Sequence, residues 1–325
     1  MTQIIDATVA KTRSLSSDVM QIDLRPQGGD IPFEPGGHID VHVPIGSSVE
    51  TRSYSQVAAG ADGSIRIAVK RVANSRGGSE YMHSLRPGDR VSVSSDRNNF
   101  PLSYGAKSYA LLAGGIGITP IVSMAHALAG AGKDFTLLYC VRSAGDAAFA
   151  ETLAADFGDR FVLHDDSRDG VLDSAAFIAS LDPDTELYMC GPIPMMDAVR
   201  RAWQAAERPI TRLRFETFGT GGQGDAVAFT VTVKETGATV SVPPNMSMLE
   251  ALVGAGQSIL YDCKRGECGL CKVEIEDLHG RIDHRDVFLS DREHAQNRSM
   301  CACVSRIVGG DAVIRTDSIS HGRES

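Results

Sequence analysis

The 325-residue sequence has no apolar run near the roughly 18 residues that a membrane-spanning helix needs. Its formal net charge is −9 and it contains no basic tail, so we do not expect nucleic acid or an anionic membrane as the main partner. The first residues lack the apolar core of a secretory signal, and no catalytic triad or carboxylate pair is suggested. These absences favour a cytoplasmic protein, and roughly 100–200 residues per domain predicts two or three domains.

Seven cysteines are present, an odd number that fits a disulfide framework poorly. Five of them lie in the last quarter of the chain, which points to metal or redox chemistry. Cys263, Cys268 and Cys271 have the C-x4-C-x2-C spacing of plant-type [2Fe–2S] proteins, in which a distant fourth cysteine completes the site. Gly266 and Gly269 supply the backbone freedom that such a loop needs. Zinc is the alternative, although zinc sites favour paired C-x2-C knuckles.

The first part of the chain alternates apolar and polar positions in short segments that are separated by turns. This pattern favours a closed antiparallel barrel, with a β-sandwich as the alternative. We predict strands at residues 3–15, 19–26, 38–44, 51–58, 64–72 and 89–96.

Nearly continuous apolar runs then alternate with helix-like stretches, as in parallel sheets whose strands are buried on both faces. The predicted strands are residues 108–115, 135–141, 160–166 and 185–191. The predicted helices are residues 120–132, 146–158, 173–181 and 195–207.

The glycine-rich residues 219–226 have the composition of a linker. After it the β pattern returns, with a hairpin over residues 228–244 that turns near Gly237 and a short amphipathic helix over residues 247–256.

A second glycine-rich segment, GGIGITP, follows the first apolar strand of the α/β region. Gly114, Gly115 and Gly117 allow backbone amides to approach a pyrophosphate at a helix N-terminus. Thr119 offers a hydroxyl, and Pro120 suits the first helical turn. A tight turn that serves packing only is the alternative.

Three motifs in order, RSYS at residues 52–55, GGIGITP at 114–120 and CGP at 190–192, resemble those of the ferredoxin–NADP reductase superfamily. The cysteine cluster follows these motifs in the sequence, and the whole chain resembles the phthalate dioxygenase reductase and vanillate demethylase reductase family. The resemblance implies a multidomain α/β and β fold. Its parts would be an FMN-binding β-barrel (1–105), an NAD(P)H-binding α/β domain (106–218), a linker (219–226) and a β-grasp plant-type ferredoxin domain (227–325).

The resemblance places the flavin on two barrel segments. Arg52 would neutralise a flavin phosphate, the Tyr54 ring would pack on the flavin, and Ser55 would hydrogen-bond near its N5 atom. An aromatic residue, Phe218 or Phe215, would cover the flavin. The remaining flavin residues are Ser53, Ala68, Val69, Lys70, Arg76, Gly77, Gly78 and Ser79. Arg76 is consistent with the terminal phosphate of FMN, while a β-turn and a solvated charge run are the alternatives for this second segment.

The same resemblance implies that Cys190, followed by Gly191 and Pro192, lies beside the nicotinamide. Cys190, Ser55 and Thr119 would then position the nicotinamide against the flavin. Arg142 would lie near the adenosine ribose, where arginine can serve a 2′-phosphate. Most reductases of this kind use NADH, which we therefore expect.

Two cysteines compete to be the fourth cluster ligand. Cys301 has the spacing of plant ferredoxins, whereas Cys303 precedes V-S-R, as the ligand does in ferredoxin domains fused to oxygenase reductases. We favour Cys303 and expect Cys301 and Cys140 to be bystanders. The histidines have no metal-ligand spacing and are expected to be structural or solvent-facing: His38, His42, His83 and His284.

The implied activity is that of the monomeric reductase component of a multicomponent oxygenase. It would take a hydride from NADH onto FMN and pass single electrons through the [2Fe–2S] cluster to a terminal oxygenase of the Rieske non-haem iron type. One alternative is an FAD-containing reductase that serves a cytochrome P450 or a diiron monooxygenase. The other is a binding or sensing protein that keeps the fold without turnover.

Overall fold

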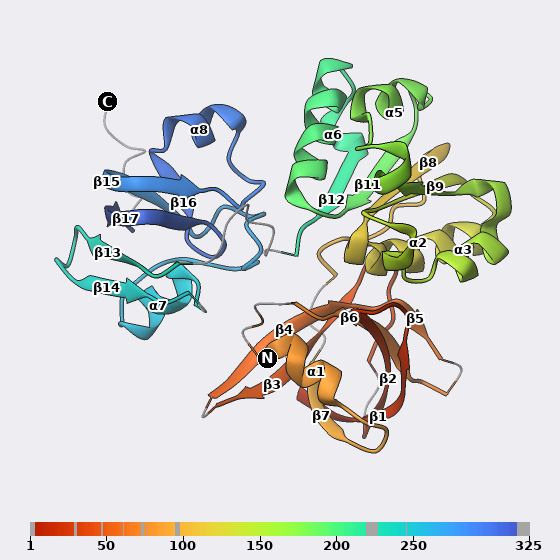
Figure 1. The fold of residues 1–325 in the computed structure, drawn as a ribbon, viewed down its shortest axis with the longest axis horizontal. Coiled ribbons are helices and arrows are strands. Elements are labelled where there is room, and N and C mark those ends of the chain that lie inside the picture. The colour runs from red at the N-terminus through yellow and green to blue at the C-terminus, as the bar shows by residue number, and fades with distance from the viewer. Residues whose placement is uncertain are drawn as a thin grey trace. The chain divides into compact units, whose positions relative to one another are not determined.

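The computed structural model describes residues 4–28, 31–46, 48–60, 62–72, 75, 77–94, 98–218, 227–244 and 246–316. The chain forms two compact units, Met1–Glu216 and Thr217–Ser325 (Figure 1). The predicted linker, residues 219–226, lies outside the described residues. Among the described helices, none combines the length and the apolar character that crossing a membrane requires.

The first unit begins with a seven-stranded antiparallel sheet that curves into a barrel-like shape (Figure 1). Its strand order is β4-β3-β7-β1-β2-β6-β5, so β4 and β5 form its edges. Alternate side chains point into one core that includes Ile22, Leu24, Val41 and Val43. The strands are β1 (Ile4–Ser14), β2 (Val19–Gln27), β3 (His38–Ile45), β4 (Ser48–Ser55), β5 (Ala58–Ala59), β6 (Ile65–Lys70) and β7 (Arg90–Ser94), with α1 (Gly78–Ser84) after β6.

The second part of this unit is a five-stranded parallel sheet in the order β10-β9-β8-β11-β12. Its strands are β8 (Ser108–Gly114), β9 (Asp134–Val141), β10 (Phe161–Asp165), β11 (Glu186–Cys190) and β12 (Leu213–Glu216). The helices are α2 (Ile118–Gly130), α3 (Ala150–Phe157), α4 (Asp166–Asp169), α5 (Ser174–Ser180) and α6 (Ile193–Ala205). In Figure 1, α5 and α6 lie on one side of the sheet and α2 and α3 on the other. The helices explain why β8 and β11 are almost completely buried.

The four predicted strands of this sheet are confirmed, but its fifth strand, β12, is not among them. This edge strand has only four residues, LRFE, in which polar and apolar side chains alternate. It therefore lacks the continuous apolar run by which the other strands are recognised.

One hydrophobic core joins the barrel to the parallel sheet. Val19, Val57 and Phe100 from the barrel side pack together with α2 and with β8, β9 and β11. The backbone N–H of Gly36 also donates to the hydroxyl of Ser123 on α2, at 3.0 Å. The predicted flavin and nucleotide segments therefore belong to one compact body.

The second unit contains a five-stranded mixed sheet in the order β14-β13-β17-β15-β16. The central pair, β13 and β17, is parallel, and the other pairs are antiparallel. Its elements are β13 (Phe229–Val233), β14 (Thr239–Val242), α7 (Met248–Gly254), β15 (Lys272–Asp283), α8 (Asp291–Gln296), β16 (Ser299–Cys301) and β17 (Arg306–Arg315). The predicted hairpin and helix are confirmed: Gly237 has a left-handed φ of 67° in the turn, and a Ser247–Glu250 capping box starts α7.

Candidate functional site

The glycine-rich turn after β8 packs directly against the segment that follows β11. A Cβ atom on Gly117 would lie 2.2 Å from the carbonyl oxygen of Cys190. A Cβ atom on Gly114 would lie 2.6 Å from Cδ of Pro192, and one on Gly191 would lie 3.0 Å from Cα of Gly114. Any side chain at these positions would overlap backbone or ring atoms, so packing between the two motifs requires these glycines.

Gly115 differs from the other glycines of the turn. It has a left-handed φ of 53°, and nothing lies within 4 Å of the position that its Cβ would occupy. Thr119 is buried, and its hydroxyl donates to the Ile116 carbonyl at 3.0 Å. Pro120 is buried in the first turn of α2. The turn therefore leaves open space beside Gly115, while the Thr119 hydroxyl fixes the shape of the turn.

Cys190 ends β11 and is completely buried. It is paired with Ala113 of β8 on one side and with Glu216 of β12 on the other. Arg142 follows β9 and has an exposed side chain, and its carbonyl accepts a hydrogen bond from Ser167 N at 3.1 Å. The structure therefore brings Cys190 and Arg142 to the carboxyl ends of two parallel strands that flank β8, at the edge where open α/β sheets bind ligands.

The first flavin segment, RSYS, lies on β4 and touches the second. The Arg52 guanidinium forms an ion pair with Glu50 and donates to the Thr51 carbonyl at 2.9 Å. A Cβ atom on Gly78 would lie 2.8 Å from Nε of Arg52, so the arginine side chain lies directly against the start of α1. Two segments that are 26 positions apart thus place a cation beside a glycine-rich backbone, which suits a phosphate group.

The other side chains of RSYS have different environments. Burial raises the pKa of the Tyr54 phenol to about 12, although nearby Arg52 opposes the shift. Ser55 is buried at the end of β4. Ser53 is exposed, and its hydroxyl donates a hydrogen bond to a carboxylate oxygen of Asp40. Tyr54 is therefore neutral at physiological pH and presents an uncharged aromatic ring.

Polar groups of the second flavin segment form hydrogen bonds within their own loop. The Ser79 hydroxyl accepts a hydrogen bond from Val72 N at 3.1 Å and donates to the Ser75 hydroxyl at 3.0 Å. Gly77 has a φ of 91°, a conformation that favours glycine. Arg76 lies outside the described residues.

Residues 68–70 lie on β6 and face different ways. The Val69 side chain belongs to the barrel core, whereas Ala68 packs in the core shared with the parallel sheet. Lys70 forms an ion pair with Asp18 at 3.2 Å. Of these three residues, only Lys70 presents a polar side chain.

The two candidate flavin-covering aromatics lie in different units. Phe215 is on β12, and the Arg200 guanidinium lies over its ring at 5.4 Å. Phe218 belongs to the second unit and is 38% exposed.

The cysteine loop runs from the end of α7 to the start of β15. Cys263 and Cys268 are half-buried, and Cys271 is buried immediately before β15. Gly266 and Gly269 have left-handed φ values of 76° and 74°, which confirms the predicted need for glycine. A Cβ atom on Gly269 would overlap the ring of Phe288.

Backbone amides of this loop point at sulfur atoms. The N–H groups of Arg265 and Cys268 donate to Sγ of Cys263, each at 3.4 Å. The N–H of Gly266 donates to the sulfur of Cys303, which lies in the turn after β16. Amide donors aimed at sulfur are the arrangement that stabilises thiolate ligands of an iron–sulfur cluster.

The thiol groups of Cys301 and Cys303 lie within hydrogen-bonding reach of the Cys271 sulfur. Hydrogen bonds from the thiols of Cys301 and Cys303 lower the pKa of the Cys271 thiol. Cys301 is fully buried in the core of the second unit. Together with Cys263 and Cys268, the sulfurs offer the thiolate set that a [2Fe–2S] cluster needs, so these residues fit that group.

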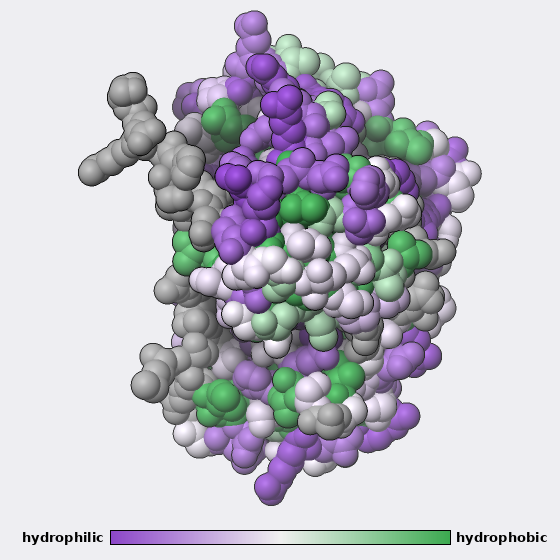
Figure 2. Space-filling view, turned by 90° about the vertical axis from the view of Figure 1, so that its left-hand side faces the viewer, coloured by the Kyte–Doolittle hydropathy of each residue, from purple (hydrophilic) through white to green (hydrophobic). Residues whose placement is uncertain are grey.

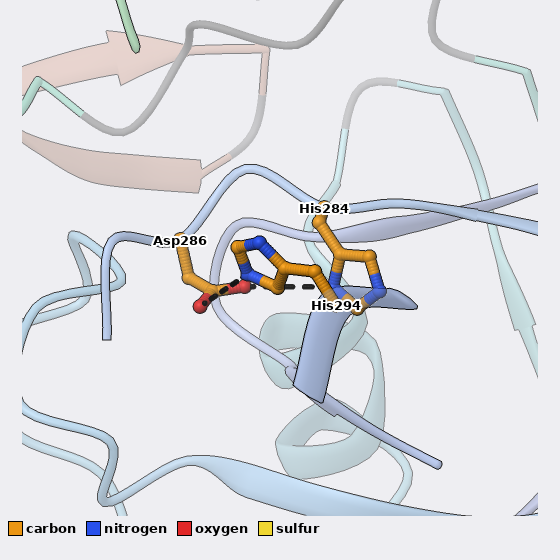
Figure 3. A group of neighbouring side chains, drawn as sticks. All are labelled: His284, Asp286 and His294. Atoms are coloured by element: carbon orange, nitrogen blue, oxygen red, sulfur yellow. Dashed lines mark hydrogen bonds and ion pairs between the residues drawn. The ribbon is translucent and has the colours of Figure 1, made fainter. Parts of the chain in front are cut away.

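A group of three polar residues, the buried Asp286 and the half-buried His284 and His294, lies beside the cysteine loop (Figure 3). Asp286 accepts hydrogen bonds from His294 Nε2 at 3.2 Å and from the Ser305 hydroxyl at 3.1 Å. The rings of His284 and His294 stack at 4.3 Å, and the ion pair between His284 Nδ1 and Asp286 Oδ1 measures 3.7 Å. Burial raises the pKa of Asp286, but hydrogen bonds from the two histidines and from the Leu289 N–H together hold that pKa below its ordinary value.

Asp286 also lies against Gly266, since a Cβ on the glycine would be 2.9 Å from Cα of Asp286. Through Gly266 and Ser305 the carboxylate therefore connects the cysteine loop to the segment that carries Cys303. Sequence spacing did not assign this role to His284, and it did not identify Asp286 or His294 as partners, because the contacts depend on the fold.

Large apolar side chains remain exposed on the cysteine loop and at Phe288, which lies against Gly269 of that loop. Those on the loop are Leu260, Tyr261 and Leu270. The ammonium group of Lys264 lies over the Tyr261 ring at 5.1 Å. On the face drawn in Figure 2, hydrophobic side chains form separate groups among hydrophilic ones. Surfaces of mixed polarity suit transient protein contacts better than permanent ones.

Three family models match the chain in order. They are an oxidoreductase FAD-binding domain over residues 6–101, an oxidoreductase NAD-binding domain over residues 111–201 and a 2Fe-2S iron-sulfur cluster binding domain over residues 231–308. Vanillate O-demethylase oxidoreductase from Pseudomonas sp. (strain HR199 / DSM 7063) is 37% identical over 311 residues, which cover 93% of this chain and 97% of that protein. The chain belongs to the phthalate dioxygenase and vanillate demethylase reductase family.

Other similar proteins extend this family. Tetrachlorobenzoquinone reductase from Sphingobium chlorophenolicum is 40% identical over 313 residues, which cover 93% of this chain and 94% of that protein. The solved structure of phthalate dioxygenase reductase is 34% identical, has a TM-score of 0.75 and covers 96% of this chain and 98% of that chain. The structure of an intact type IV self-sufficient cytochrome P450 monooxygenase is 33% identical with a TM-score of 0.66, and there the match spans 41% of the longer chain.

The resemblance inferred from the motifs is therefore confirmed, and so is the multidomain fold class. The protein is an NADH-dependent oxidoreductase with a flavin-binding barrel and a [2Fe–2S] ferredoxin domain, and its role is electron transfer.

Proposed function

We propose that this protein is the reductase component of a multicomponent oxygenase and passes electrons from NADH to a terminal oxygenase. The main support is that, within each unit, motif residues that are far apart in the sequence contact one another. The nucleotide turn packs on Cys190, Arg52 lies against Gly78, and loop amides point at Cys263 and Cys303. When bound, the flavin accepts two electrons together and supplies them singly to the cluster.

The flavin is proposed to be FMN. The cation of Arg52 next to Gly77–Ser79 would hold a single terminal phosphate, with Arg76 as a further cation from the sequence, and Tyr54 would offer an uncharged ring. Ala68, Val69 and Lys70 would border the flavin, and an aromatic side chain, Phe218 or Phe215, would cover it. Extracting the flavin from purified protein and separating FMN from FAD by chromatography tests this assignment directly.

For the nicotinamide, Cys190, Ser55 and Thr119 are proposed as the positioning residues. Gly115 would admit the pyrophosphate through its open space, whereas Gly114, Gly117 and Thr119 would act by shaping the turn. Arg142 would lie beside the adenosine ribose. A kcat/KM that is higher with NADH than with NADPH would support the proposed coenzyme preference, and the reverse would contradict it.

Cys263, Cys268, Cys271 and Cys303 are proposed as the cluster ligands. The Gly266 amide favours Cys303 over Cys301, because it ties the Cys303 sulfur to the loop that holds Cys263 and Cys268.

The proposed partner is a Rieske non-haem iron oxygenase. Support comes from relatives that are named as reductases of vanillate O-demethylase and phthalate dioxygenase. A cytochrome P450 is the second candidate, because the self-sufficient P450 chain contains a similar reductase region. The resemblance also predicts a monomer in the cytoplasm, and light scattering of the purified chain tests the first of these.

Reconstitution decides between the acceptors. Purified reductase and NADH are mixed anaerobically with a Rieske oxygenase, a ferredoxin-free P450 or a chlorinated benzoquinone, and acceptor reduction is followed optically. The proposal expects the Rieske cluster to be reduced at the highest rate. Faster reduction of the P450 haem or of the quinone would overturn the choice of partner, and absence of NADH oxidation with every acceptor would overturn the reductase function itself.

A further inference from the structure

Thr217, the first residue of the second unit, is buried and holds the cysteine loop. Its backbone N–H donates to Oε1 of Glu267 at 2.6 Å. Its hydroxyl lies 2.8 Å from the carbonyl oxygen of Arg265 and 3.0 Å from Oε1 of Glu267. One threonine thus contacts the residues on both sides of Gly266.

The contact to Arg265 matters because of the peptide group it touches. The Arg265 carbonyl and the Gly266 N–H belong to one planar peptide and point in opposite directions. At one end of this peptide the carbonyl accepts from Thr217, and at the other end the N–H donates to the sulfur of Cys303. The hydroxyl therefore controls where that N–H points, and it polarises the peptide so that the N–H becomes a stronger donor.

The rest of Gly266 is already fixed by other contacts. Its own carbonyl accepts from Val287 N at 3.0 Å. A Cβ atom on Gly266 would lie 2.6 Å from Cγ2 of Val304 and 2.9 Å from Cα of Asp286, so Gly266 is tightly packed on that side. The carbonyl oxygen of the peptide between Arg265 and Gly266 is held by the Thr217 hydroxyl.

We propose that Thr217 is a positioning residue that aims the Gly266 N–H at the sulfur of Cys303 and thereby raises the reduction potential of the [2Fe–2S] cluster. Hydrogen bonds to cluster sulfurs stabilise the more negative, reduced state, so their loss lowers the potential. Glu267 supports the arrangement by holding the backbone of Thr217. The inference rests on the proposed assignment of Cys303 as a ligand.

The test is a redox titration of the full-length protein, with the reduced cluster followed by EPR. Thr217→Val keeps the shape of the side chain but removes the hydroxyl, and Thr217→Ser retains the hydroxyl as the matched control. We expect Thr217→Val to make cluster reduction about tenfold less favourable, a downward shift of about 59 mV for one electron. Thr217→Ser is expected to match the wild type, and the flavin potential is expected to stay unchanged in both variants.

An unchanged cluster potential in Thr217→Val, or an equal shift in Thr217→Ser, overturns the inference. If Thr217→Val does not retain its cluster, a second pair decides: Glu267→Gln and Glu267→Ala are both neutral, but only Gln keeps an acceptor for Thr217 N–H. A lower potential in the Ala variant supports the inference, and equal potentials overturn it. A wild-type protein without a [2Fe–2S] EPR signal would instead contradict the proposed function.

Discussion

At the scale of single residues, the surroundings of each sulfur separate the cysteines. Cys263 and Cys303 accept hydrogen bonds from backbone amides of the cysteine loop. Cys301 lies in the same core as Cys303 and is completely buried. Cys140 lies on β9, where burial raises the pKa of its thiol to about 12. It therefore stays protonated and unreactive, in keeping with the bystander role that its isolation predicts.

The choice between Cys303 and Cys301 gives the first prediction. Cys303→Ser is expected to lose most of its bound iron and acid-labile sulfide, because serine is a poor substitute for a thiolate ligand. Cys301→Ser replaces a buried thiol without removing a proposed ligand and is expected to keep its cluster. Iron and sulfide assays together with visible absorption measure both outcomes. A cluster that is retained in Cys303→Ser and lost in Cys301→Ser would reverse the assignment.

Asp286 gives the second prediction, which concerns stability and pH. Because its folded-state pKa is lowered, its ionised form stabilises the fold above the unfolded value of about 3.9, and this contribution disappears as the pH falls through the folded value. Asp286→Asn is expected to lower the free energy of unfolding by about 3 kcal/mol at pH 7. The difference from wild type is expected to shrink below about pH 4.

Urea unfolding followed by loss of cluster absorption measures this difference across pH. The control is Asp277→Asn, which changes a carboxylate whose side chain is 66% exposed and is expected to alter stability by less than about 0.5 kcal/mol. Equal changes in the free energy of unfolding would show that Asp286, in the group drawn in Figure 3, stabilises the fold no more than an exposed carboxylate does.

Sequence alone could locate the residues of the motifs, but not those that hold them. The cysteine spacing identifies the loop because local chain geometry sets which sulfurs can converge. Thr217 lies 48 positions before Arg265, and Asp286 acts through Gly266, His294 and Ser305. Neither residue has a local pattern, since their partners meet only in the folded chain.

At the scale of elements, the turn after β8 and the end of β11 form one tightly packed pair. Gly117→Ala would push a methyl group into the Cys190 carbonyl, where the approach is only 2.2 Å. We expect it to destabilise the protein by about 2 kcal/mol and to raise KM for NADH, because the turn must move. Gly130→Ala, at the end of α2 with nothing within 4 Å, is the matched control and should leave both quantities nearly unchanged.

Thermal unfolding and steady-state kinetics measure these effects. If Gly117→Ala retains the wild-type KM and stability, the turn is more adaptable than its packing indicates. The element pattern was predictable wherever an apolar run was long, as for β8, β9, β10 and β11. The short strand β12 was not, because packing against β11 rather than its own composition determines it.

At the scale of the whole molecule, the order of motifs predicted the order of the redox segments along the chain. The described chain forms two compact units, and the first contains both the barrel and the parallel sheet. The shared core of these two parts was not visible in the sequence. Val19, Val57 and Phe100 look like ordinary barrel residues until they are seen packed against α2.

A whole-molecule prediction follows from having both redox segments in one chain. Anaerobic titration with NADH is expected to bleach the flavin bands and the iron–sulfur absorption of the wild type. Cys271→Ser should lose the iron–sulfur absorption while its flavin still bleaches, because the flavin segments lie in the other unit. Visible spectra record both results. Flavin that no longer bleaches in this variant would show that the first unit depends on the cluster for its reduction.

The close packing of Gly114 and Gly117 on Cys190 and Pro192 also limits how such reductases can be recombined. The two segments are 73 positions apart in the sequence, counted from Gly117 to Cys190, yet neither has room for a partner of different shape. A chimera that imports the turn from another reductase without the matching CGP segment would combine surfaces that have not been selected together. Exchange between family members should therefore succeed when both segments are transplanted as one cassette, with crossovers placed before β8 and after α6.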